Sequence, residues 1–257
     1  MTVDWSQQGQ FGWLTLNNPQ RKNAMTIAMR QSMADRLEAI AFDESIRAVV
    51  VIGAGDTFCS GADIEQMGPE GPPQSRIRMQ RGGHRIIKAL HNLEKPVVSV
   101  VRGSAIGLGW SLALASDIVL TATTARFGMP HLKSGLMPDC GALYFLTRQI
   151  GLYKAKELIF SGRLIGAAEA HALGLATKIV DDAELDGEAL RVAEELVAAP
   201  TFSLGLTKKL FSACMSPTLE EFLQQESLMA PQLRHTEDFR EGIAAFREKR
   251  KPNFKGR

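Results

Sequence analysis

Hydrophobic positions in the first part of the chain change from a period of two to a helical period. Residues 11–16 alternate as in a half-buried strand, and the turn-forming segment Asn-Asn-Pro-Gln-Arg-Lys-Asn follows them. From Thr26 onward, the spacing is that of a helix with one apolar face, and charged residues such as Arg30 occupy its other faces. The apolar side chains recur at helical spacing, at Met29, Met33, Leu37 and Ile40. We therefore predict a strand, a turn and an amphipathic helix that Thr26 caps.

Two apolar runs without polar alternation follow, at residues 48–52 and 96–101. Each predicts a strand that is covered on both faces, and each ends in a glycine-containing loop of small residues. The order of buried strand, small-residue loop and helix therefore occurs twice, at residues 49–67 and 97–116. The repeat lies in the pattern and not in residue identity.

The remaining stretches of this part of the chain are less regular. A Pro- and Gly-rich stretch at residues 67–73 leads into a helical segment that runs to about residue 93. A third strand is predicted at residues 118–121, and glycine, proline and helix-like segments continue to about residue 180. Strands that alternate with helices predict the α/β class.

Beyond Asp186 the pattern is helical only. Residues 216–217 (Ser-Pro) place proline at a first helical position, and residues 236–238 (Thr-Glu-Asp) put acidic side chains in a first turn. One face of the last helix is apolar and needs a core or another subunit to cover it. This face consists of Phe239, Ile243 and Phe246. We predict a core domain over residues 1–195 and a helical region over residues 196–257 that covers this core or another subunit.

Composition and charge exclude several classes of partner. The 257 residues carry 30 basic and 28 acidic side chains, so no global field favours nucleic acid or anionic lipid. The first ten residues lack a signal-peptide pattern, and no window offers about 18 uninterrupted apolar residues. Cysteine and histidine spacings fit neither a disulfide framework nor a zinc site. We expect a cytoplasmic protein with no metal, no membrane partner and no nucleic-acid partner.

Glycines at positions 103, 107 and 109 follow the second buried strand. Their order, G-x-x-x-G-x-G, is not that of a dinucleotide-binding loop, and the chain has no P-loop motif. Where small residues lead from a strand into a helix, free backbone amides lie in front of the positive end of a helix dipole. Two such turns could form an oxyanion hole together, or serve only as tight turns between packed elements.

Five segments spread over nearly the whole chain closely resemble one known family. They are NNPQRKNAM (17–25), FCSGADIEQM (58–67), KPVVSVVRGSAIGLGWSLALASDI (95–118), FGMPHLKSGLMPDCG (127–141) and FREKRKPNFKG (246–256). Their order and spacing are similar to those of the crotonase, or enoyl-CoA hydratase/isomerase, superfamily. The resemblance implies an α/β crotonase-like spiral of ββα repeats, a C-terminal helical trimerisation region, and a homo-oligomer that is a trimer or a dimer of trimers.

The resemblance also implies binding residues. The amides of Ala62 and Leu108 match the two donors of the family's oxyanion hole. Leu108 replaces the usual glycine, and we expect its side chain to narrow the acyl pocket. Seven residues match positions that hold coenzyme A, the last two of them near the nucleotide phosphates: Lys22, Ala24, Ser60, Asp63, Ile64, Phe246 and Lys249. Coenzyme A is expected as part of an acyl-CoA or enoyl-CoA substrate, without a separate cofactor.

The family's catalytic carboxylates are replaced in this chain. Its hydratases carry two glutamates, and Ser111 and His131 stand at the matching positions. Asp139 lies instead in Gly-Leu-Met-Pro-Asp-Cys-Gly, which is similar to a segment of phenylacetate-pathway-type isomerases in which that aspartate moves the proton. We therefore predict that Asp139 is catalytic. His131 is a second acid/base, a group that activates water, or a structural donor, and Cys140 would be a nucleophile only beside an activating base.

The predicted reaction is the shift of a double bond in an enoyl-CoA by way of an enolate. The two amides would hold the enolate, and Asp139 would take a proton from C2 or C4 and return it to the other carbon. The alternatives are hydration of an enoyl-CoA, and hydrolysis of a CoA thioester or a β-dicarbonyl by His131 and Asp139. From another class, the chain would be an acyl-CoA-binding pseudoenzyme.

Overall fold

The computed structural model describes residues 1–66, 68, 71–215 and 217–257. Its centre is a sheet in the order β1-β2-β3-β4-β6-β9, in which β1 and β2 pair antiparallel and the following strands pair parallel. A smaller sheet has the order β5-β7-β8. The strands are β1 (Thr2–Gln8), β2 (Phe11–Asn17), β3 (Ala48–Gly53), β4 (Val97–Val101), β5 (Ser104–Ile106), β6 (Ile118–Ala122), β7 (Arg126–Gly128), β8 (Ile165–Gly166) and β9 (Lys178–Val180).

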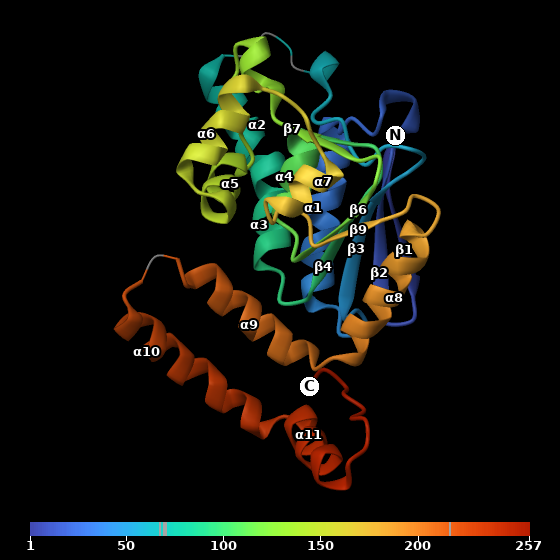
Figure 1. The fold of residues 1–257 in the computed structure, drawn as a ribbon, viewed down its shortest axis with the longest axis vertical. Helices are drawn as coiled ribbons and strands as arrows, with labels where there is room; N and C mark the ends of the chain where they lie inside the picture. Colours follow the sequence, from blue (N-terminus) through green and yellow to red (C-terminus); the bar gives the residue numbers. More distant parts are fainter. Residues whose placement is uncertain (67, 69–70, 216) are drawn as a thin grey trace.

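Helices cover both faces of the larger sheet (Figure 1). Helix α8 (Leu185–Ala198) packs on one face, against β2, β3, β4 and β6. Helices α1 (Ile27–Phe42), α3 (Gly83–Asn92) and α4 (Leu108–Leu114) lie on the other. The layer is extended by α2 (Pro72–Arg81), α5 (Ala142–Ile150), α6 (Leu152–Ser161) and α7 (Ala167–Ala172). No described helix is long and apolar enough to cross a membrane.

The sequence prediction of strands covered on both faces is confirmed in β3. Val49 and Val51 contribute to the core under α1 and α3, whereas Ala48 and Val50 contribute to the core under α8. All four side chains are fully buried. Successive side chains of a strand point to opposite faces, so an unbroken apolar run fits a sheet between two helical layers.

The predicted amphipathic helix is α1. The Thr26 side chain accepts a hydrogen bond of 3.1 Å from the amide of Met29, which is the expected cap. The predicted apolar stripe of Met29, Met33, Leu37 and Ile40 is buried. The cap therefore fixes the chain direction directly after the turn at residues 17–25.

The prediction of a helix after the first small-residue loop was wrong. A single 3-10 turn, η2 (Ile64–Gln66), follows that loop, and its continuation at residue 67 lies outside the described residues. The helical segment that was expected to run to about residue 93 consists of α2 and α3, which meet at Gly82. Gly82 has φ −105° and ψ −102°, a backbone conformation that no α-helix contains.

Short strands were missed where the sequence is rich in glycine and proline. The loop predicted at residues 103–109 contains β5, and β7, β8 and β9 lie in the stretch that was expected to be helix-like. Each of these strands has two or three residues, which is too few to show a period of two. Their pairing comes from contacts between distant parts of the chain.

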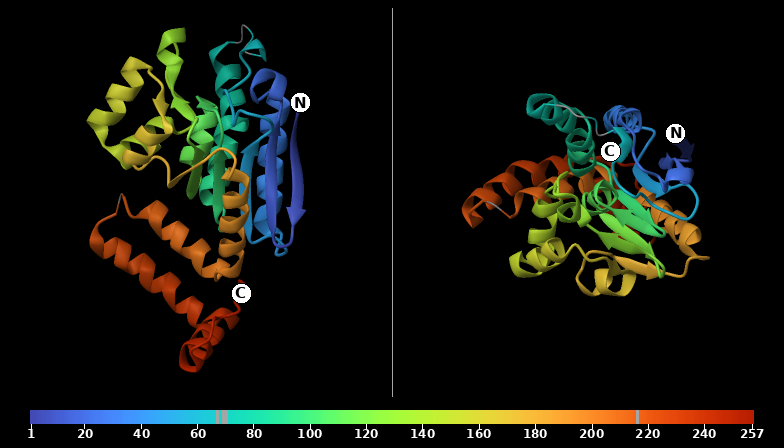
Figure 2. Two further views of the ribbon diagram at one scale, coloured as in Figure 1. Left: turned by 45° about the vertical axis from the view of Figure 1, so that its right-hand side comes forward. Right: turned by 90° about the horizontal axis from the view of Figure 1, so that it is seen from above.

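The C-terminal helices α9 (Thr201–Ala213), α10 (Leu219–Met229) and α11 (Glu237–Glu248) extend away from the sheet (Figure 2). The prediction that Pro217 occupies a first helical position was wrong, because Thr218 is the N-cap of α10 and forms a capping box with Glu221. Ser216 lies outside the described residues. The acidic first turn of α11 is confirmed, with Thr236 as its cap.

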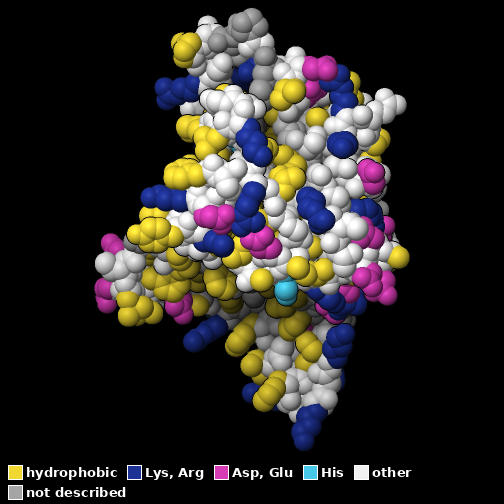
Figure 3. Space-filling model, turned by 45° about the horizontal axis from the view of Figure 1, so that its top comes forward, with side chains coloured by type: hydrophobic (Ala, Val, Ile, Leu, Met, Phe, Trp, Pro, Cys, Tyr) yellow, Lys and Arg dark blue, Asp and Glu magenta, His cyan; other side chains and the backbone are white. Residues whose placement is uncertain are grey.

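The face predicted on α11 is exposed. Phe239, Ile243 and Phe246 are 43%, 41% and 84% exposed, and hydrophobic side chains gather on the lower, C-terminal part of the molecule in Figure 3. The division between residues 195 and 196 stays a prediction. Helix α8, which packs on the sheet, continues to Ala198.

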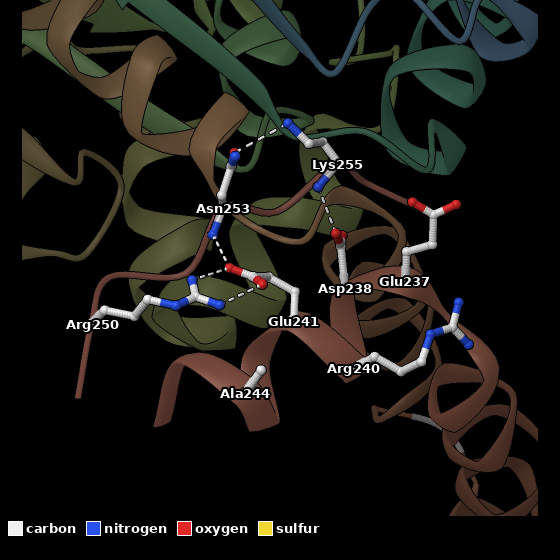
Figure 4. A pocket seen from close by; sticks show the side chains of 8 residues that line it. All are labelled: Glu237, Asp238, Arg240, Glu241, Ala244, Arg250, Asn253 and Lys255. Carbon is white, nitrogen blue, oxygen red and sulfur yellow. Dashed lines mark hydrogen bonds and ion pairs between the residues drawn. The ribbon is translucent and has the colours of Figure 1, made fainter. Parts of the chain in front are cut away.

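The end of the chain folds back and is fastened to α11. Asp238 in α11 accepts hydrogen bonds from the amides of Lys255 and Gly256, and Glu241 pairs with Arg250. These residues border an open pocket of about 520 Å³ (Figure 4). Because its charged groups pair largely with one another, the pocket is explained by the anchoring of the tail.

Candidate active site

Two segments that are far apart in sequence run side by side at the centre of the candidate site. The amide of Cys59 donates to the Ser104 carbonyl at 2.9 Å, and the amide of Ile106 donates to the Cys59 carbonyl at the same distance. Cys59 and Ala105 form a parallel bridge. Three residues further along each segment are Ala62 and Leu108. The parallel pairing therefore brings the Gly61-Ala62 peptide next to the Gly107-Leu108 peptide.

Glycine is required where these segments approach each other. A Cβ on Gly61 would lie 3.2 Å from the Ile106 carbonyl oxygen and 3.9 Å from the Leu108 amide nitrogen, and Gly61 has φ +111°. A Cβ on Gly109 would lie 2.3 Å from the Cys59 carbonyl oxygen. Only residues without a side chain allow this backbone separation.

The amides of Ala62 and Leu108 are available to a ligand. Around Ala62, the Met25 amide donates to the Gly61 carbonyl and the Asp63 amide donates to the Met25 carbonyl. Among the hydrogen bonds of the described residues, neither the Ala62 amide nor the Leu108 amide has an acceptor. Leu108 is the first residue of α4, so its amide has no partner within the helix.

The prediction of a helix dipole behind both amides is met at only one of them. The sequence predicted a helix behind each amide, but only Leu108 begins an α-helix, whereas Ala62 precedes the 3-10 turn η2. The helix dipole therefore assists an oxyanion mainly from the Leu108 side.

His131 and Asp139 come together beside these amides. The distance between His131 Nε2 and Asp139 Oδ1 is 3.9 Å, and the two side chains are 18% and 31% exposed. His131 Cε1 is 3.3 Å from the point where a Cβ on Gly107 would lie, so the imidazole faces the Gly107-Leu108 turn. Its Nδ1 is buried and has no partner among the described residues.

The segment after Pro138 fixes Asp139. The Asp139 carbonyl accepts a hydrogen bond from the amide of Ala142 at 3.0 Å, and both Cys140 and Gly141 have left-handed backbone conformations with φ of 50° and 78°. Burial raises the pKa of the Cys140 thiol, and the neighbouring Asp139 raises it further. A protonated thiol is a weak nucleophile, which disfavours the nucleophile alternative.

Ser111 lies in the buried part of α4. Its side chain is fully buried, and its hydroxyl has no partner among the described residues. A hydroxyl cannot replace a carboxylate as a general base without a further activating group. Among the described residues, Asp139 is the carboxylate that lies within 4.0 Å of His131.

The structure brings together five of the residues matched to coenzyme A: Lys22, Ala24, Ser60, Asp63 and Ile64. The Ser60 amide donates to the Lys22 carbonyl at 2.9 Å, which joins the two loops. Lys22 and Ile64 are exposed, whereas Asp63 is buried and pairs with Arg21 at 3.1 Å. The Asp63 carboxylate thus holds the loops together, and its contact with coenzyme A stays a prediction.

Phe246 and Lys249 lie away from these loops within one chain. Both belong to the end of α11, at the lower end of the molecule in Figure 1, and both are exposed. Their predicted contact with coenzyme A therefore needs a second copy of the chain or a different position of α11.

Sequence reasoning missed two arginines at the site. Arg21 pairs with Asp63 and Glu65. Arg30 was placed on an outer face of its helix, but its side chain is half-buried and close enough to Asp139 for their charges to interact. The available signal was its spacing, since Arg30 lies three residues before Met33 and therefore beside the apolar stripe.

Comparisons with known proteins agree with this geometry. The family model described as enoyl-CoA hydratase/isomerase matches residues 7–257. The chain is 37% identical to 1,2-epoxyphenylacetyl-CoA isomerase from Escherichia coli (strain K12), over 95% of this chain and 94% of that protein. It is 32% identical to 2,3-dehydroadipyl-CoA hydratase from the same organism, over 98% of each.

A solved structure confirms the fold. The crystal structure of an enoyl-CoA hydratase from Polaromonas sp. JS666 superposes with a TM-score of 0.94 at 34% identity, covering 99% of this chain and 100% of that one. The resemblance found in the sequence and the predicted α/β crotonase-like fold are therefore confirmed. The chain belongs to the enoyl-CoA hydratase/isomerase family and is an acyl-CoA-processing enzyme of the crotonase fold.

Proposed function

We propose that the chain is an enoyl-CoA isomerase in which Asp139 moves the proton. The observation that carries the proposal is the position of this carboxylate, 3.9 Å from His131, which itself faces the Gly107-Leu108 turn. Ser111 and His131 occupy the positions of the hydratase glutamates, so the chain lacks the pair that adds water. The Escherichia coli relative is named 1,2-epoxyphenylacetyl-CoA isomerase, which supports isomerisation of a CoA thioester as the class of reaction.

The proposed reaction needs one base and one oxyanion site. The thioester oxygen accepts hydrogen bonds from the amides of Ala62 and Leu108, each contributing roughly 3 to 4 kcal/mol to the stability of the enolate. Asp139 takes a proton from C2, and the electron pair of that bond moves toward the thioester oxygen. When the carbonyl forms again, the double bond shifts and C4 takes the proton from Asp139. The enzyme ends unchanged.

A test uses trans-3-enoyl-CoA substrates in deuterated water. Double-bond migration with deuterium at C2 or C4 is expected for the wild type, and Asp139→Asn is expected to lower the rate about 10² to 10⁴-fold because the general base is lost. Free coenzyme A among the products would indicate hydrolysis, and a hydroxyacyl product would indicate hydration. If Asp139→Asn has unchanged turnover on every substrate, the assignment of Asp139 is wrong, and if the wild type turns over none of these substrates, the isomerase proposal fails.

His131 offers the second candidate activity. Its imidazole faces the Gly107-Leu108 turn and lies 3.9 Å from Asp139, so the two groups together could activate a water molecule for hydrolysis of a thioester or a β-dicarbonyl. The 3.9 Å separation leaves both groups free to contact other atoms. Ring-opened acid or free coenzyme A among the products favours this reading.

The proposed assembly is a homo-oligomer, a trimer or a dimer of trimers. The exposed apolar face of Phe239, Ile243 and Phe246 supports it, since large exposed apolar patches mark interaction surfaces. A second copy would also bring Phe246 and Lys249 toward coenzyme A. Light scattering at micromolar concentration tests the assembly. Action in the cytoplasm and independence of any cofactor other than the coenzyme A of the substrate remain predictions.

A further inference from the structure

Arg30 forms part of the wall between α1 and the junction of α2 with α3. Its Nη1 and Cδ atoms are 3.8 and 3.9 Å from the point where a Cβ on Gly82 would lie, and its Nε donates a long hydrogen bond of 3.4 Å to the Thr26 carbonyl. A Cβ on the next residue, Gly83, would lie 2.5 Å from Cys140 Sγ and 3.8 Å from Leu108 Cδ1. Arg30 therefore belongs to the same wall as the residues around the oxyanion amides.

The guanidinium of Arg30 forms no ion pair with a residue that the structure describes. Within the described part of the chain, no carboxylate lies within 4.0 Å of its guanidinium. The acidic side chains that act on its charge from farther away are Asp139 and Asp63, and Asp63 already pairs with Arg21. Burial lowers the pKa of Arg30, and the charge of Arg78 lowers it further. A partly desolvated guanidinium without a counter-ion destabilises a protein.

Resting on the acyl-CoA site proposed above, we propose that Arg30 binds a carboxylate carried by the acyl group, so that the preferred substrate is a CoA thioester of a dicarboxylic acid. A guanidinium offers a planar fork of donors that matches a carboxylate. Arg30 lies next to Gly82, and Cys140 and Asp139 are near enough for their charges to act on it. Because Asp139 is the proposed base, we infer that Arg30 lies on the side of the site that receives the acyl group. The bound carboxylate supplies the counter-ion that the protein does not.

This proposal also explains why an unpaired charge is retained at a partly buried position. Replacing Arg30 by an apolar residue of similar length would remove a desolvated charge, which is neutral or stabilising in comparable cases. Substrate recognition then explains why the arginine at position 30 is kept. Arg36, on the same helix, is exposed, and its Cζ lies 5.4 Å from the centroid of the Trp5 ring. It provides a control with the same change of charge.

The test measures binding of unreactive saturated thioesters by calorimetry, so that it does not depend on turnover. The matched pairs are succinyl-CoA with butyryl-CoA, glutaryl-CoA with pentanoyl-CoA, and adipoyl-CoA with hexanoyl-CoA. For at least one pair, the wild type is expected to bind the dicarboxylic member about tenfold or more tightly, the range of a charge-assisted hydrogen bond. Arg30→Met is expected to bring that ratio near one, and Arg36→Met is expected to keep it.

Three outcomes would overturn the proposal. They are a wild type without preference at any chain length, a preference that survives in Arg30→Met, and an equal loss of affinity for free coenzyme A, which would make Arg30 a phosphate ligand. The melting temperature of Arg30→Met is expected to be unchanged or higher; if it falls, the ratio is taken from Arg30→Gln. The isomerase proposal fails separately, through the deuterium experiment on Asp139→Asn.

Discussion

The imidazole Nε2 of His131 lies 3.9 Å from Oδ1 of Asp139, beyond the length of a direct hydrogen bond. The two side chains are therefore not hydrogen-bonded to each other, and both can contact a substrate bound at the amides of Ala62 and Leu108. His131 also has a buried Nδ1 without a partner among the described residues. Such an atom is more readily explained at a ligand site than in a packed core.

His131→Ala separates the roles of the two side chains. We expect isomerisation to continue, because the proposed mechanism moves the proton through Asp139 alone, whereas any hydrolysis should slow by about 10²-fold, the contribution of a positioned acid/base group. Exchange of the C2 proton with deuterated solvent should continue, because Asp139 and the two amides remain. Both rates are measured by mass spectrometry of the recovered thioester. An equal loss of exchange and isomerisation would show instead that His131 only positions Asp139.

Gly109→Ala is expected to damage the oxyanion hole from behind. The added Cβ would lie 2.3 Å from the Cys59 carbonyl oxygen, so the two paired segments must separate. We expect a loss of about 3 kcal/mol in the free energy of unfolding, measured by urea titration. The turnover of the protein that remains folded should also fall.

Gly187→Ala is the matched control for Gly109. Gly187 lies inside α8, and a Cβ there would meet no atom within 4 Å. Because alanine loses less backbone entropy in a helix, this change should raise the free energy of unfolding by about 0.5 to 1 kcal/mol. Equal effects of the two substitutions would contradict the role of close approach at Gly109.

The sequence was sufficient to predict the parts of the fold that follow from local periodicity. Unbroken apolar runs predicted β3 and β4, and the spacing from Met29 to Ile40 predicted α1 with its cap. The short strands β5 and β7 could not be predicted in this way, because three residues carry no period and their pairing partners are far along the chain. The break at Gly82 was missed although the Gly82-Gly83 pair is a turn signal, because helical spacing continues on both sides of it.

The site shows the same division between local and distant information. The resemblance in the motifs pointed to Ala62, Leu108, His131 and Asp139, whose roles stay predictions. The pairing of Cys59 with Ala105 explains how distant loops meet. Arg30 could not be found from its motif, since a charged residue beside an apolar stripe usually points to solvent. The structure shows that the Arg30 side chain packs against the junction of α2 and α3 at Gly82, and this contact between distant parts of the chain was not visible in the sequence.

Arg47 connects the C-terminal helices to the sheet. Its guanidinium donates to Thr201 Oγ1 at 2.8 Å, to the Ala199 carbonyl at 2.6 Å and to the Phe254 carbonyl at 3.0 Å. Arg47→Met would leave these acceptors without their donor, and we expect a loss on the order of 3 kcal/mol in the free energy of unfolding. Limited proteolysis should show faster cleavage near residues 199–200. The exposed Arg36→Met should change the stability by less than about 1 kcal/mol.

Acid is expected to release the end of the chain through Glu241. The Glu241 carboxylate accepts hydrogen bonds from Arg250 at 2.6 and 2.9 Å and from the Asn253 amide at 2.7 Å (Figure 4). The Arg250 hydrogen bonds are the main cause that lowers its pKa to about 2, from an ordinary value of 4.5. The folded state thus binds this proton less readily than the unfolded state, so the stabilisation is fully present above about pH 4.5 and is lost as the pH falls through about 2.

The measurement for Glu241 is amide hydrogen exchange over residues 250–257, compared between the wild type and Glu241→Gln. The variant lacks the charge at every pH, so its tail should exchange faster than that of the wild type at neutral pH. The difference between the two proteins should shrink below about pH 4.5 and vanish near pH 2. Asp238→Asn is a useful comparison, because it removes the charge at the Lys255 and Gly256 amides and leaves the Arg250 pair in place. A tail whose exchange does not differ between wild type and Glu241→Gln at neutral pH would show that Glu241 does not help to fasten it.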